Sequence, residues 1–478
     1  MRYQSTGAVL TASLIGAGSL CSVIASAQDR GIGVLDVEIS ALQDAKVWGR
    51  VGAYPTGRIG IGAITQSHNV GTVNVDWFSA GTIGEAIDNR HPFIGQNMYR
   101  LRDGRLEQIG LAWLKHGFFS VNDSCADSPG NFLGVGCFDT YGNFTNANRQ
   151  ELGPRSEVNP LTGYWESTGS HFDTGEVGYP PAFPGDGIRT HDTNGAPHDA
   201  DDHRLRVADQ DLLDSDALTQ IFIEAFYVVM DDADIENNYA HRQIRADPPS
   251  PAPDWDFVGL SGFDQRPAID DWGDTVATAA PTTEGKVRIA SRVVALDPTH
   301  NRYEYNIFNM NLDRQIGSFE VPIGDGVVLS DFGFHAPVED EEPLYSAAPW
   351  APTVNAGSVV WAPPAPNAGA GEDFPNTIRY GTMYTFWFTA DSESADSVVA
   401  LEQHKPGTES ALTAIIAAPC VLAADLNSDG VIDTADLGLL IGEFGTPGTL
   451  ADINTDGIVD TADLGLLIGS FGEDCLAG

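Results

Sequence analysis

Two nearly identical stretches decide how the last part of the chain folds. They read DLNSDGVIDTADLGLLIGEFG from Asp425 to Gly445 and DINTDGIVDTADLGLLIGSFG from Asp452 to Gly472. In each copy, short acidic or amide side chains occupy positions one, three, five, nine and twelve, and glycine occupies position six. This is the spacing of an EF-hand loop, whose oxygen ligands converge on one calcium ion. The repeat therefore predicts two bound calcium ions.

The chemistry of calcium explains each position of the loop. Calcium is a hard cation that takes six to eight oxygen ligands. Glycine permits the sharp turn, position seven contributes a backbone carbonyl, and the acid at position twelve closes the shell and begins a helix. The apolar residue at position eight, Ile432 or Val459, is expected to pair the two loops. The predicted ligands are Asp425, Asn427, Asp429, Val431, Asp433, Asp436, Asp452, Asn454, Asp456, Ile458, Asp460 and Asp463.

A helix is expected after each loop. Apolar residues recur at i, i+3, i+4 and i+7, which is one face of a helix, and a glycine follows where a C-cap is expected. A segment of about 60 residues is too short to build a large core, so we expect the two helices to pack face to face. The predicted faces are Leu437, Leu440, Ile441 and Phe444, and Leu464, Leu467, Ile468 and Phe471.

Each predicted helix also contains two glycines one turn apart, Gly438 with Gly442 and Gly465 with Gly469. An interior glycine costs about 1 kcal/mol relative to alanine. The resulting smooth face has two interpretations. Either a partner backbone or helix lies against it, or it packs closely within the module itself.

With these motifs, the segment from Cys420 to Cys475 resembles a type I dockerin, a paired loop–helix calcium module that docks onto cohesin domains. Its bracketing cysteines are similar to those of dockerin-like modules that end many exported bacterial proteins. The resemblance implies calcium at the residues named above and a cohesin-like or other surface protein as partner. It also implies that loop positions ten and eleven help to choose the partner. These residues are Thr434, Ala435, Thr461 and Ala462.

The first residues predict an export signal. Arg2 supplies positive charge, an apolar run extends from Ala8 to Ile24, and Ala25-Ser26-Ala27 fits a cleavage site. The mature chain is expected to begin at Gln28 and to be secreted or attached to the cell surface. No other run has the length of a membrane-spanning helix, so no membrane span is expected.

The four cysteines that follow the leader are Cys125, Cys137, Cys420 and Cys475. An even number in an exported chain favours two disulfides, and four cysteines permit three pairings. The most economical pairing joins Cys125 to Cys137 and Cys420 to Cys475, because the second pair brackets the repeat.

The chain is strongly acidic, with 67 Asp and Glu, 25 Lys and Arg and a formal net charge of −42. Such a surface repels phosphate backbones, so nucleic acid is not an expected partner. The charge suits solubility and divalent cations, and it identifies neither a fold nor a substrate.

From Gln28 to about Ala418 the pattern is typical of β-structure. Apolar residues alternate with polar ones in TVNVDWF (72–78) and RYEYNIF (302–308), which is the period of a half-buried strand. The continuous apolar run IFIEAFYVVM (221–230) is expected to be a central strand or a short buried helix. We expect antiparallel β-structure in one or two sandwiches.

The proline-rich stretch DPPSPAPDW, Asp247–Trp255, is the predicted seam between two β regions. The segment from Asp123 to Asp214 has little periodicity and is expected to form ordered loops. The predicted organisation is a signal peptide at 1–27, a β-rich region at 28–250, a sandwich-like β region at 255–418 and the calcium module at 420–475.

Residues 28–418 resemble uncharacterised exported bacterial proteins, which implies no known activity. The resemblance is carried by MYRLRDGRLEQIGLAWLKHGFF (98–119), LGVGCFDTY (133–141) and IRYGTMYTFWFTAD (378–391).

Two further features of the sequence concern histidines. His116 is either a base or a structural histidine beside aromatic side chains. The stretch HDTNGAPHDADDH combines imidazoles and carboxylates, which bind zinc and other transition metals, although a solvated loop is the alternative. Its titratable residues are His191, Asp192, His198, Asp199, Asp201, Asp202 and His203.

The leading hypothesis for residues 28–418 is a structural or binding role outside the cell. The alternative is a polysaccharide-degrading glycoside hydrolase, because dockerins commonly carry such enzymes. Glycosidases need two carboxylates around the scissile bond, and no pair can be selected among 67 acids. Trp and Tyr could stack on sugar, although Trp77 and Trp387 lie in strand patterns that predict core. No familiar catalytic motif stands out, so catalytic residues stay unassigned.

Overall fold

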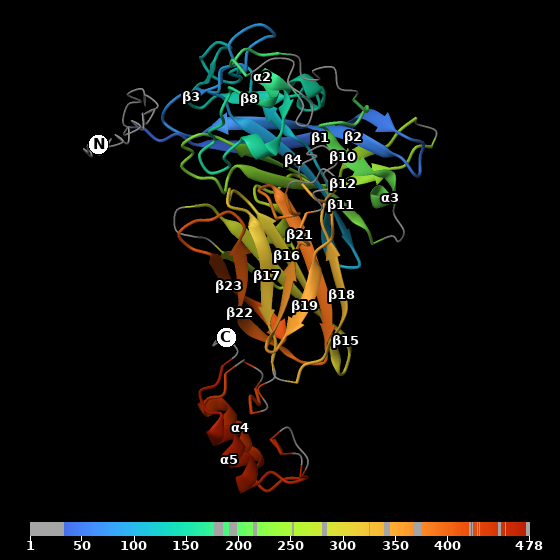
Figure 1. Ribbon diagram of the computed structural model, residues 1–478, viewed down its shortest axis with the longest axis vertical. Helices are drawn as coiled ribbons and strands as arrows, with labels where there is room; N and C mark the ends of the chain where they lie inside the picture. Colours follow the sequence, from blue (N-terminus) through green and yellow to red (C-terminus); the bar gives the residue numbers. More distant parts are fainter. Residues whose placement is uncertain are drawn as a thin grey trace, which may run out of the picture.

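The chain folds into an N-terminal β region, a β-sandwich and a C-terminal pair of helices (Figure 1). Its fold is therefore mainly antiparallel β, as predicted. The predicted signal peptide, residues 1–27, lies outside the described residues. The computed structural model describes residues 33–175, 185–190, 198–213, 218–250, 253–279, 284–324, 326–338, 345–366, 374–419, 422, 424–427, 429, 431–447, 451–454 and 456–474.

A large antiparallel sheet forms the N-terminal β region. Within the described ranges it has eleven strands, in the order β1-β2-β10-β5-β4-β11-β12-β13, with β6, β8 and β9 paired beside them. The sheet curls until β1 lies against the β11–β12 hairpin, where the N–H of Ile39 donates to the carbonyl of Asn237 at 3.1 Å. The strands are β1 (Val37–Val51), β2 (Arg58–Asn69), β4 (Phe93–Arg102), β5 (Arg105–Leu111), β6 (Leu114–His116), β8 (Phe138–Tyr141), β9 (Leu152–Gly153), β10 (Leu205–Ala208), β11 (Gln220–Val228), β12 (Tyr239–Asp247) and β13 (Asp256–Gly259).

The apolar run at 221–230 forms the central strand β11. Its alternate residues Ile221, Ile223 and Tyr227 enter the core that the curled sheet encloses. Phe226 and Val228 point to the opposite face and enter a second apolar cluster. Both faces of β11 are buried, which explains why its sequence is continuously apolar instead of alternating.

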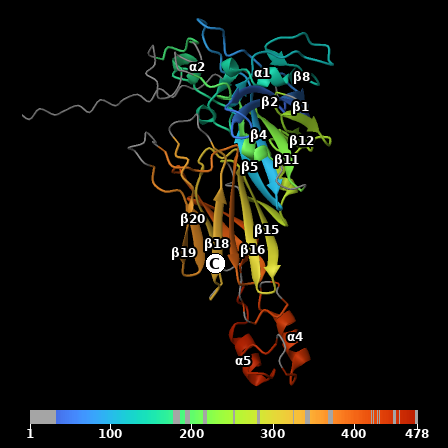
Figure 2. The same cartoon turned by 90° about the vertical axis from the view of Figure 1, so that its right-hand side faces the viewer.

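Two further antiparallel sheets pack face to face as a β-sandwich, and Figure 2 separates β19 and β20 from β15 and β16. In the part of the chain that the structure describes, each sheet has five strands, in the orders β14-β15-β16-β21-β18 and β19-β20-β17-β22-β23. The strands are β14 (Thr275–Ala279), β15 (Val287–Asp297), β16 (His300–Asn309), β17 (Ile316–Pro322), β18 (Leu329–His335), β19 (Ala351–Asn355), β20 (Ser358–Ala362), β21 (Thr382–Ala390), β22 (Ser394–Gln403) and β23 (Ala411–Pro419).

The alternating apolar residues of RYEYNIF are only some of the buried residues on β16. Tyr303, Tyr305 and Ile307 fill the sandwich core, as their pattern predicts. The polar residues between them, Glu304 and Asn306, are also fully buried. The sandwich therefore has a polar outer patch that another part of the protein covers.

The N-terminal β region reaches that patch, where Arg105 Nη2 donates to Glu304 Oε1 at 3.3 Å, and Arg155 joins the same two units. Its Nε donates to the carbonyl of Ala112 at 2.8 Å, and its Nη1 donates to the carbonyl of Gly381 in the sandwich at 2.9 Å. Its Nη2 donates to the carbonyl of Gln96 at 3.2 Å and to Asn97 Oδ1 at 3.0 Å. One buried guanidinium thus joins both β units.

Other contacts extend this junction. Gln108 Oε1 accepts from the N–H of Met383 at 2.6 Å, and the Tyr239 hydroxyl donates to the carbonyl of Met310 at 2.8 Å. Phe226 and Phe308 belong to one apolar cluster that crosses the junction. The two β units therefore form one packed body. Segments 98–119 and 378–391, two of the three that carry the resemblance to uncharacterised exported proteins, meet at this junction.

The predicted seam at Asp247–Trp255 is in the wrong place. The chain there joins β12 to β13, and both strands belong to the first sheet. The chain passes from the first sheet to the sandwich later, between β13 and β14. The prolines interrupt a hairpin and do not separate two units.

The prediction of loops for Asp123–Asp214 missed several short strands, among them β8, β9 and β10 of the first sheet. Leu205–Ala208 forms β10, which lies between β2 and β5 in the first sheet. Four residues are too few to show a period. The remaining small elements are β3 (Val75–Asp76), β7 (Phe132–Leu133), α1 (Asn143–Asn146), η1 (Arg149–Glu151), η2 (Arg155–Glu157), α2 (His171–Thr174), α3 (Asp209–Leu212) and η3 (Ala268–Asp271).

The C-terminal helices α4 (Thr434–Glu443) and α5 (Thr461–Gly469) lie beyond the end of the sandwich that is remote from the first sheet (Figure 1). None of the helices in the described residues has the length and apolar character needed to cross a membrane.

Replacing Arg155 tests the junction. Arg155→Ala removes a donor from four buried acceptors, of which the carbonyls of Gln96 and Gly381 keep a second donor. Each buried group left unsatisfied costs about 1–3 kcal/mol. We expect the free energy of unfolding to fall by at least about 3 kcal/mol in urea titrations. Arg245→Ala, which removes an exposed guanidinium paired with Asp247 at 2.7 Å, is the control and should change the midpoint little. Equal effects of the two variants would contradict the assigned role.

Candidate functional site

The acids at loop position twelve begin both C-terminal helices. Asp436 Oδ2 accepts from the N–H of Asp433 at 2.8 Å, and Asp433 Oδ1 accepts from the N–H of Ala435 at 2.6 Å. Asp463 and Asp460 form the same reciprocal capping box at α5. The side chains of both position-twelve acids are fully buried. The sequence places a carboxylate where the free N–H groups of a helix start need one.

The second oxygen of each position-twelve acid reaches back to the start of its loop. Asp436 Oδ1 accepts from the N–H groups of Leu426 and Asn427 at 2.8 and 3.2 Å. Asp463 Oδ1 accepts from the N–H of Asn454 at 3.0 Å. The N–H groups of Asp460 and Asn454 hold the pKa of Asp463 below its usual value, so this acid stays ionised.

The side chains at positions one, three and five converge inside each loop. Asp452 Oδ1 and Asn454 Oδ1 both accept from the N–H of Asp456, at 3.0 and 2.9 Å. Oxygens that share one donor necessarily lie close together. The first loop repeats the arrangement with Asp425, Asn427 and Asp429, at 3.2 and 2.9 Å.

This set of donors fits a calcium ion. Its side-chain ligands are all carboxylate or amide oxygens, and a carboxylate oxygen has more than one lone pair, so hydrogen bonding leaves it able to bind a cation. Gly457 at position six has a φ of 100°, which favours glycine. Val431 and Ile458 follow the turn at position seven, and Gly430 lies outside the described residues.

Position eight does not pair the two loops through backbone hydrogen bonds, although the side chains of Ile432 and Val459 lie in one apolar cluster. The N–H of Ile432 donates to the carbonyl of Glu473 beyond α5 at 2.9 Å. The N–H of Val459 donates to the carbonyl of Thr446 beyond α4 at 3.0 Å. Each loop therefore pairs with the segment that follows the opposite helix, because α4 and α5 run antiparallel. The two copies are related by an approximate two-fold.

Only half of each predicted apolar helix face is buried. Leu440 and Leu467 are fully buried, with Leu437 and Leu464 packed beside them. By contrast, Ile441, Phe444, Ile468 and Phe471 are 60%, 47%, 58% and 46% exposed. Two helices alone bury a narrow stripe each, and within the described residues no third layer covers the rest.

The glycines lie on an open face. A Cβ added at Gly438, Gly442, Gly465 or Gly469 would meet no atom within 4 Å. The interpretation that these glycines pack closely within the module is therefore wrong for the described residues. The residues at positions ten and eleven are exposed as well: Thr434, Ala435, Thr461 and Ala462.

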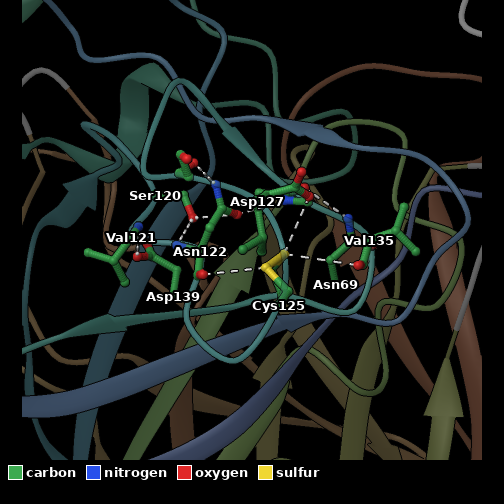
Figure 3. Close-up of a disulfide and its surroundings, with 12 residues drawn as sticks. Asn69, Ser120, Val121, Asn122, Cys125, Asp127, Val135 and Asp139 are labelled. Carbon is green, nitrogen blue, oxygen red and sulfur yellow. Dashed lines mark hydrogen bonds between the residues drawn. A yellow bond between two sulfur atoms is a disulfide. The ribbon is translucent and has the colours of Figure 1, made fainter.

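The predicted bridge between Cys125 and Cys137 is present, with the Cα atoms 5.1 Å apart (Figure 3). Asn122 braces the loop that it closes, because its Nδ2 donates to the carbonyls of Ser128 and Phe132 at 2.8 and 3.1 Å. Asp127 lies beside these sulfurs, which the bridge makes unavailable to a metal. Cys420 and Cys475 lie outside the described residues.

The acids of HDTNGAPHDADDH are held by arginines. Asp201 is fully buried and accepts from Arg58 Nε at 2.5 Å, and Arg206 pairs with Asp202 at 2.6 Å. Asp199 pairs with Arg58 Nη2 at 2.8 Å. These ion pairs account for the carboxylate cluster without a metal. His203 stacks on Trp113 with ring centroids 3.7 Å apart, so the end of this stretch is packed and is not a solvated loop; His191 and Asp192 lie outside the described residues.

His116 lies in an aromatic core. His91 Nε2 and His116 Nδ1 are 3.0 Å apart, and Trp165 and Phe172 surround His116. Burial lowers the pKa of His91 to about 3 and that of Lys115 to about 7, and it takes the pKa of His116 well below its usual range. His91, Lys115 and His116 are 5%, 1% and 0% exposed, so solvent hardly reaches these groups. The sequence did not single out His91 or Lys115, because neither residue type carries a pattern of its own.

Two grooves show what the β body offers to a ligand. One, of about 700 Å³, is lined by Phe118 and Phe144, and its acid Glu151 is paired with Arg189 at 3.4 Å. The other, of about 540 Å³, is lined by acids, including Asp391, and by no aromatic ring among the described residues. Neither combines an exposed Trp or Tyr with two facing carboxylates. Trp77 is fully buried, whereas Trp387 is half-buried and lies under the guanidinium of Arg105 at 3.7 Å.

The buried histidines predict acid sensitivity. A base whose pKa is lowered by folding takes up its proton on unfolding, so stability is lost as the pH falls through the unfolded pKa of 6.5 toward the folded value of about 3. In urea titrations between pH 7 and 4, we expect His91→Gln to show a shallower loss of stability than the wild type. His300→Gln, which changes an exposed histidine, should keep the wild-type slope. Identical slopes for all three proteins would contradict this account.

Comparisons with known proteins do not assign the chain to a family. No protein-family model and no curated protein matches it. Among solved structures, it was matched to the serine-rich repeat adhesion glycoprotein Srr1 from Streptococcus agalactiae, with 9% sequence identity, over 81% of this chain and 97% of that chain. The TM-score is 0.19, and a likeness this low says nothing about the fold or function of this protein.

Proposed function

We propose that this chain is an exported, β-rich binding or structural protein that a dockerin-like calcium module attaches to a surface or extracellular assembly. In this proposal Asp425 to Asp436 hold one calcium ion and Asp452 to Asp463 hold a second. Calcium would fix the start of each helix. The β body is the part that the module carries.

The open face of α4 and α5 is the observation that supports attachment. A small helical pair that kept Leu439, Ile441 and Phe444 exposed for no reason would be prone to aggregation. The adjacent glycines let another backbone approach closely. The approximate two-fold presents a second, equivalent face through Leu466, Ile468 and Phe471.

The tail also constrains the chemistry of its partner. It contains no Lys or Arg between Cys420 and Gly478, and its loops are rich in aspartate. A complementary partner therefore offers an apolar patch, rimmed by neutral or basic groups. A cohesin-like domain or another surface protein with these features would fit.

The compactness of the β body favours a binding or structural role over the enzymatic alternative. Trp77, Trp165 and Trp361 are fully buried, whereas Trp48 is 37% exposed. The described grooves hold no pair of carboxylates facing an exposed indole or phenol ring. Such a body presents its outer surface to ligands and not a catalytic cleft.

Attachment can be tested with the envelope fraction of the source organism. The mature chain should sediment with this fraction in calcium and should stay in solution in chelator. Ile441→Ser combined with Ile468→Ser should abolish sedimentation, because it places hydroxyls on both open faces. The matched control is Val354→Ser, which changes an apolar side chain on the sandwich that is 53% exposed. Sedimentation that is changed neither by chelator nor by Ile441→Ser with Ile468→Ser would contradict the proposal.

The role of the body can be tested on a panel of soluble and insoluble polysaccharides. We expect the mature chain to release no reducing sugar, whether or not it is retained on a polymer. Retention without release would identify a carbohydrate-binding role. Release would overturn the proposal and establish the glycoside hydrolase alternative.

A further inference from the structure

One histidine and two aspartates converge where the first sheet leads into the sandwich. His241 lies on β12, Asp264 follows β13, and Asp271 ends η3. His241 Nε2 is 2.8 Å from Asp271 Oδ2 and 4.0 Å from Asp264 Oδ2. One ligand atom from each residue lies within 4.8 Å of the other two. Three potential metal ligands thus occupy one small space.

Neighbouring groups hold the backbones of His241 and Asp264 and the side chain of Asp271. The N–H of His241 donates to the carbonyl of Asp264 at 3.0 Å, and the N–H of Asp264 donates back at 2.8 Å. Asp271 Oδ1 accepts from Arg266 Nη2 at 2.6 Å, which leaves Oδ2 directed at the histidine. Outer partners of this kind commonly orient the ligands of protein metal sites.

The protonation of His241 follows from its other ring nitrogen. Nδ1 lies 2.9 Å from the carbonyl oxygen of Arg266, and a carbonyl only accepts, so Nδ1 carries a proton. In the neutral ring, Nε2 then directs a lone pair at two carboxylates. This arrangement is stable only if Nε2 is also protonated or if a cation lies between the three groups.

The second carboxylate favours the cation. An imidazolium–aspartate pair needs only Asp271, and it leaves Asp264 without a role because 4.0 Å is too long for a hydrogen bond. The Asp264 carboxylate makes no hydrogen bond within the described residues. The histidine side chain is 2% exposed, so it is fixed within the protein. A divalent ion would use both carboxylates as ligands.

A zinc-like ion fits this space after a small movement of the side chains. Zinc binds nitrogen and oxygen at about 2.0–2.2 Å, so two ligand atoms on one ion lie no more than about 4.2 Å apart. The separation of 4.0 Å satisfies this limit, and the separation of 2.8 Å, which is a hydrogen-bond length, would widen slightly when an ion binds. An imidazole selects zinc and other transition metals over calcium. The side chains of Asp264 and Asp271 are 57% and 34% exposed, which leaves room for water as a further ligand.

We propose that His241, Asp264 and Asp271 form a binding site for a divalent transition-metal ion of the zinc class. The ion ties β12 to the segment between β13 and β14, through which the chain passes from the first sheet to the sandwich. The site is separate from the calcium loops and does not depend on the function proposed for them.

Zinc titration of the full mature chain tests this site. The protein is first stripped with chelator and then held in excess calcium, so that the C-terminal loops do not report on zinc. Asp264→Asn removes one ligand but keeps the shape of an exposed side chain, so the variant should fold. We expect its zinc affinity to fall by at least about tenfold in calorimetric titrations. Zinc should also raise the urea midpoint of the wild type and not that of the variant.

A second histidine–aspartate pair supplies the matched control. His300 Nδ1 and Asp297 Oδ1 are 3.0 Å apart on the exposed surface of the sandwich. Asp297→Asn should bind zinc as tightly as the wild type does. The proposal is overturned if the wild type binds no zinc, or if Asp264→Asn retains wild-type affinity and stabilisation.

Discussion

The buried guanidinium of Arg155 is the contact on which the β body depends. It donates to Asn97, Asn97 Nδ2 donates to Glu224 at 2.8 Å, and Glu224 also accepts from the N–H of Ala268 at 2.8 Å. Burial raises the pKa of Glu224, as expected for an acid enclosed in protein. A buried charge persists only when its hydrogen bonds are satisfied, and these partners come from both sides of the junction. The large sheet and the sandwich are therefore one body.

The C-terminal helices have a different balance of forces. Among the described residues, their buried apolar core has six members, including Leu440 and Leu467, whereas the β body has three large clusters. Their loops gather aspartates that repel one another until a cation neutralises them. We propose that calcium supplies the stability that this small core lacks. A rigid body carried on an ion-dependent module suits a protein that is held in place outside a cell.

The sequence predicted what depends on local pattern. The alternation of Tyr303, Tyr305 and Ile307 indicated a strand, and the spacing of Asp433 and Asp436 indicated a helix start. It could not show which faces meet. Glu304 is polar but buried, because it lies at a junction between segments far apart in sequence. Ile441 is apolar but exposed, because a two-helix module has no third layer in the described residues. His241, Asp264 and Asp271 come together through backbone pairing that no spacing reveals.

The most direct test of the account is circular dichroism of the isolated segment from Ala418 to Gly478 during a calcium titration. In the proposed module calcium organises the loops that begin both helices, so the helical signal should rise and saturate at two ions per chain. Asp425→Ala combined with Asp452→Ala, which removes the first ligand of each loop, should abolish the rise. A helical signal that stays unchanged in excess calcium would contradict the claim that calcium builds this module.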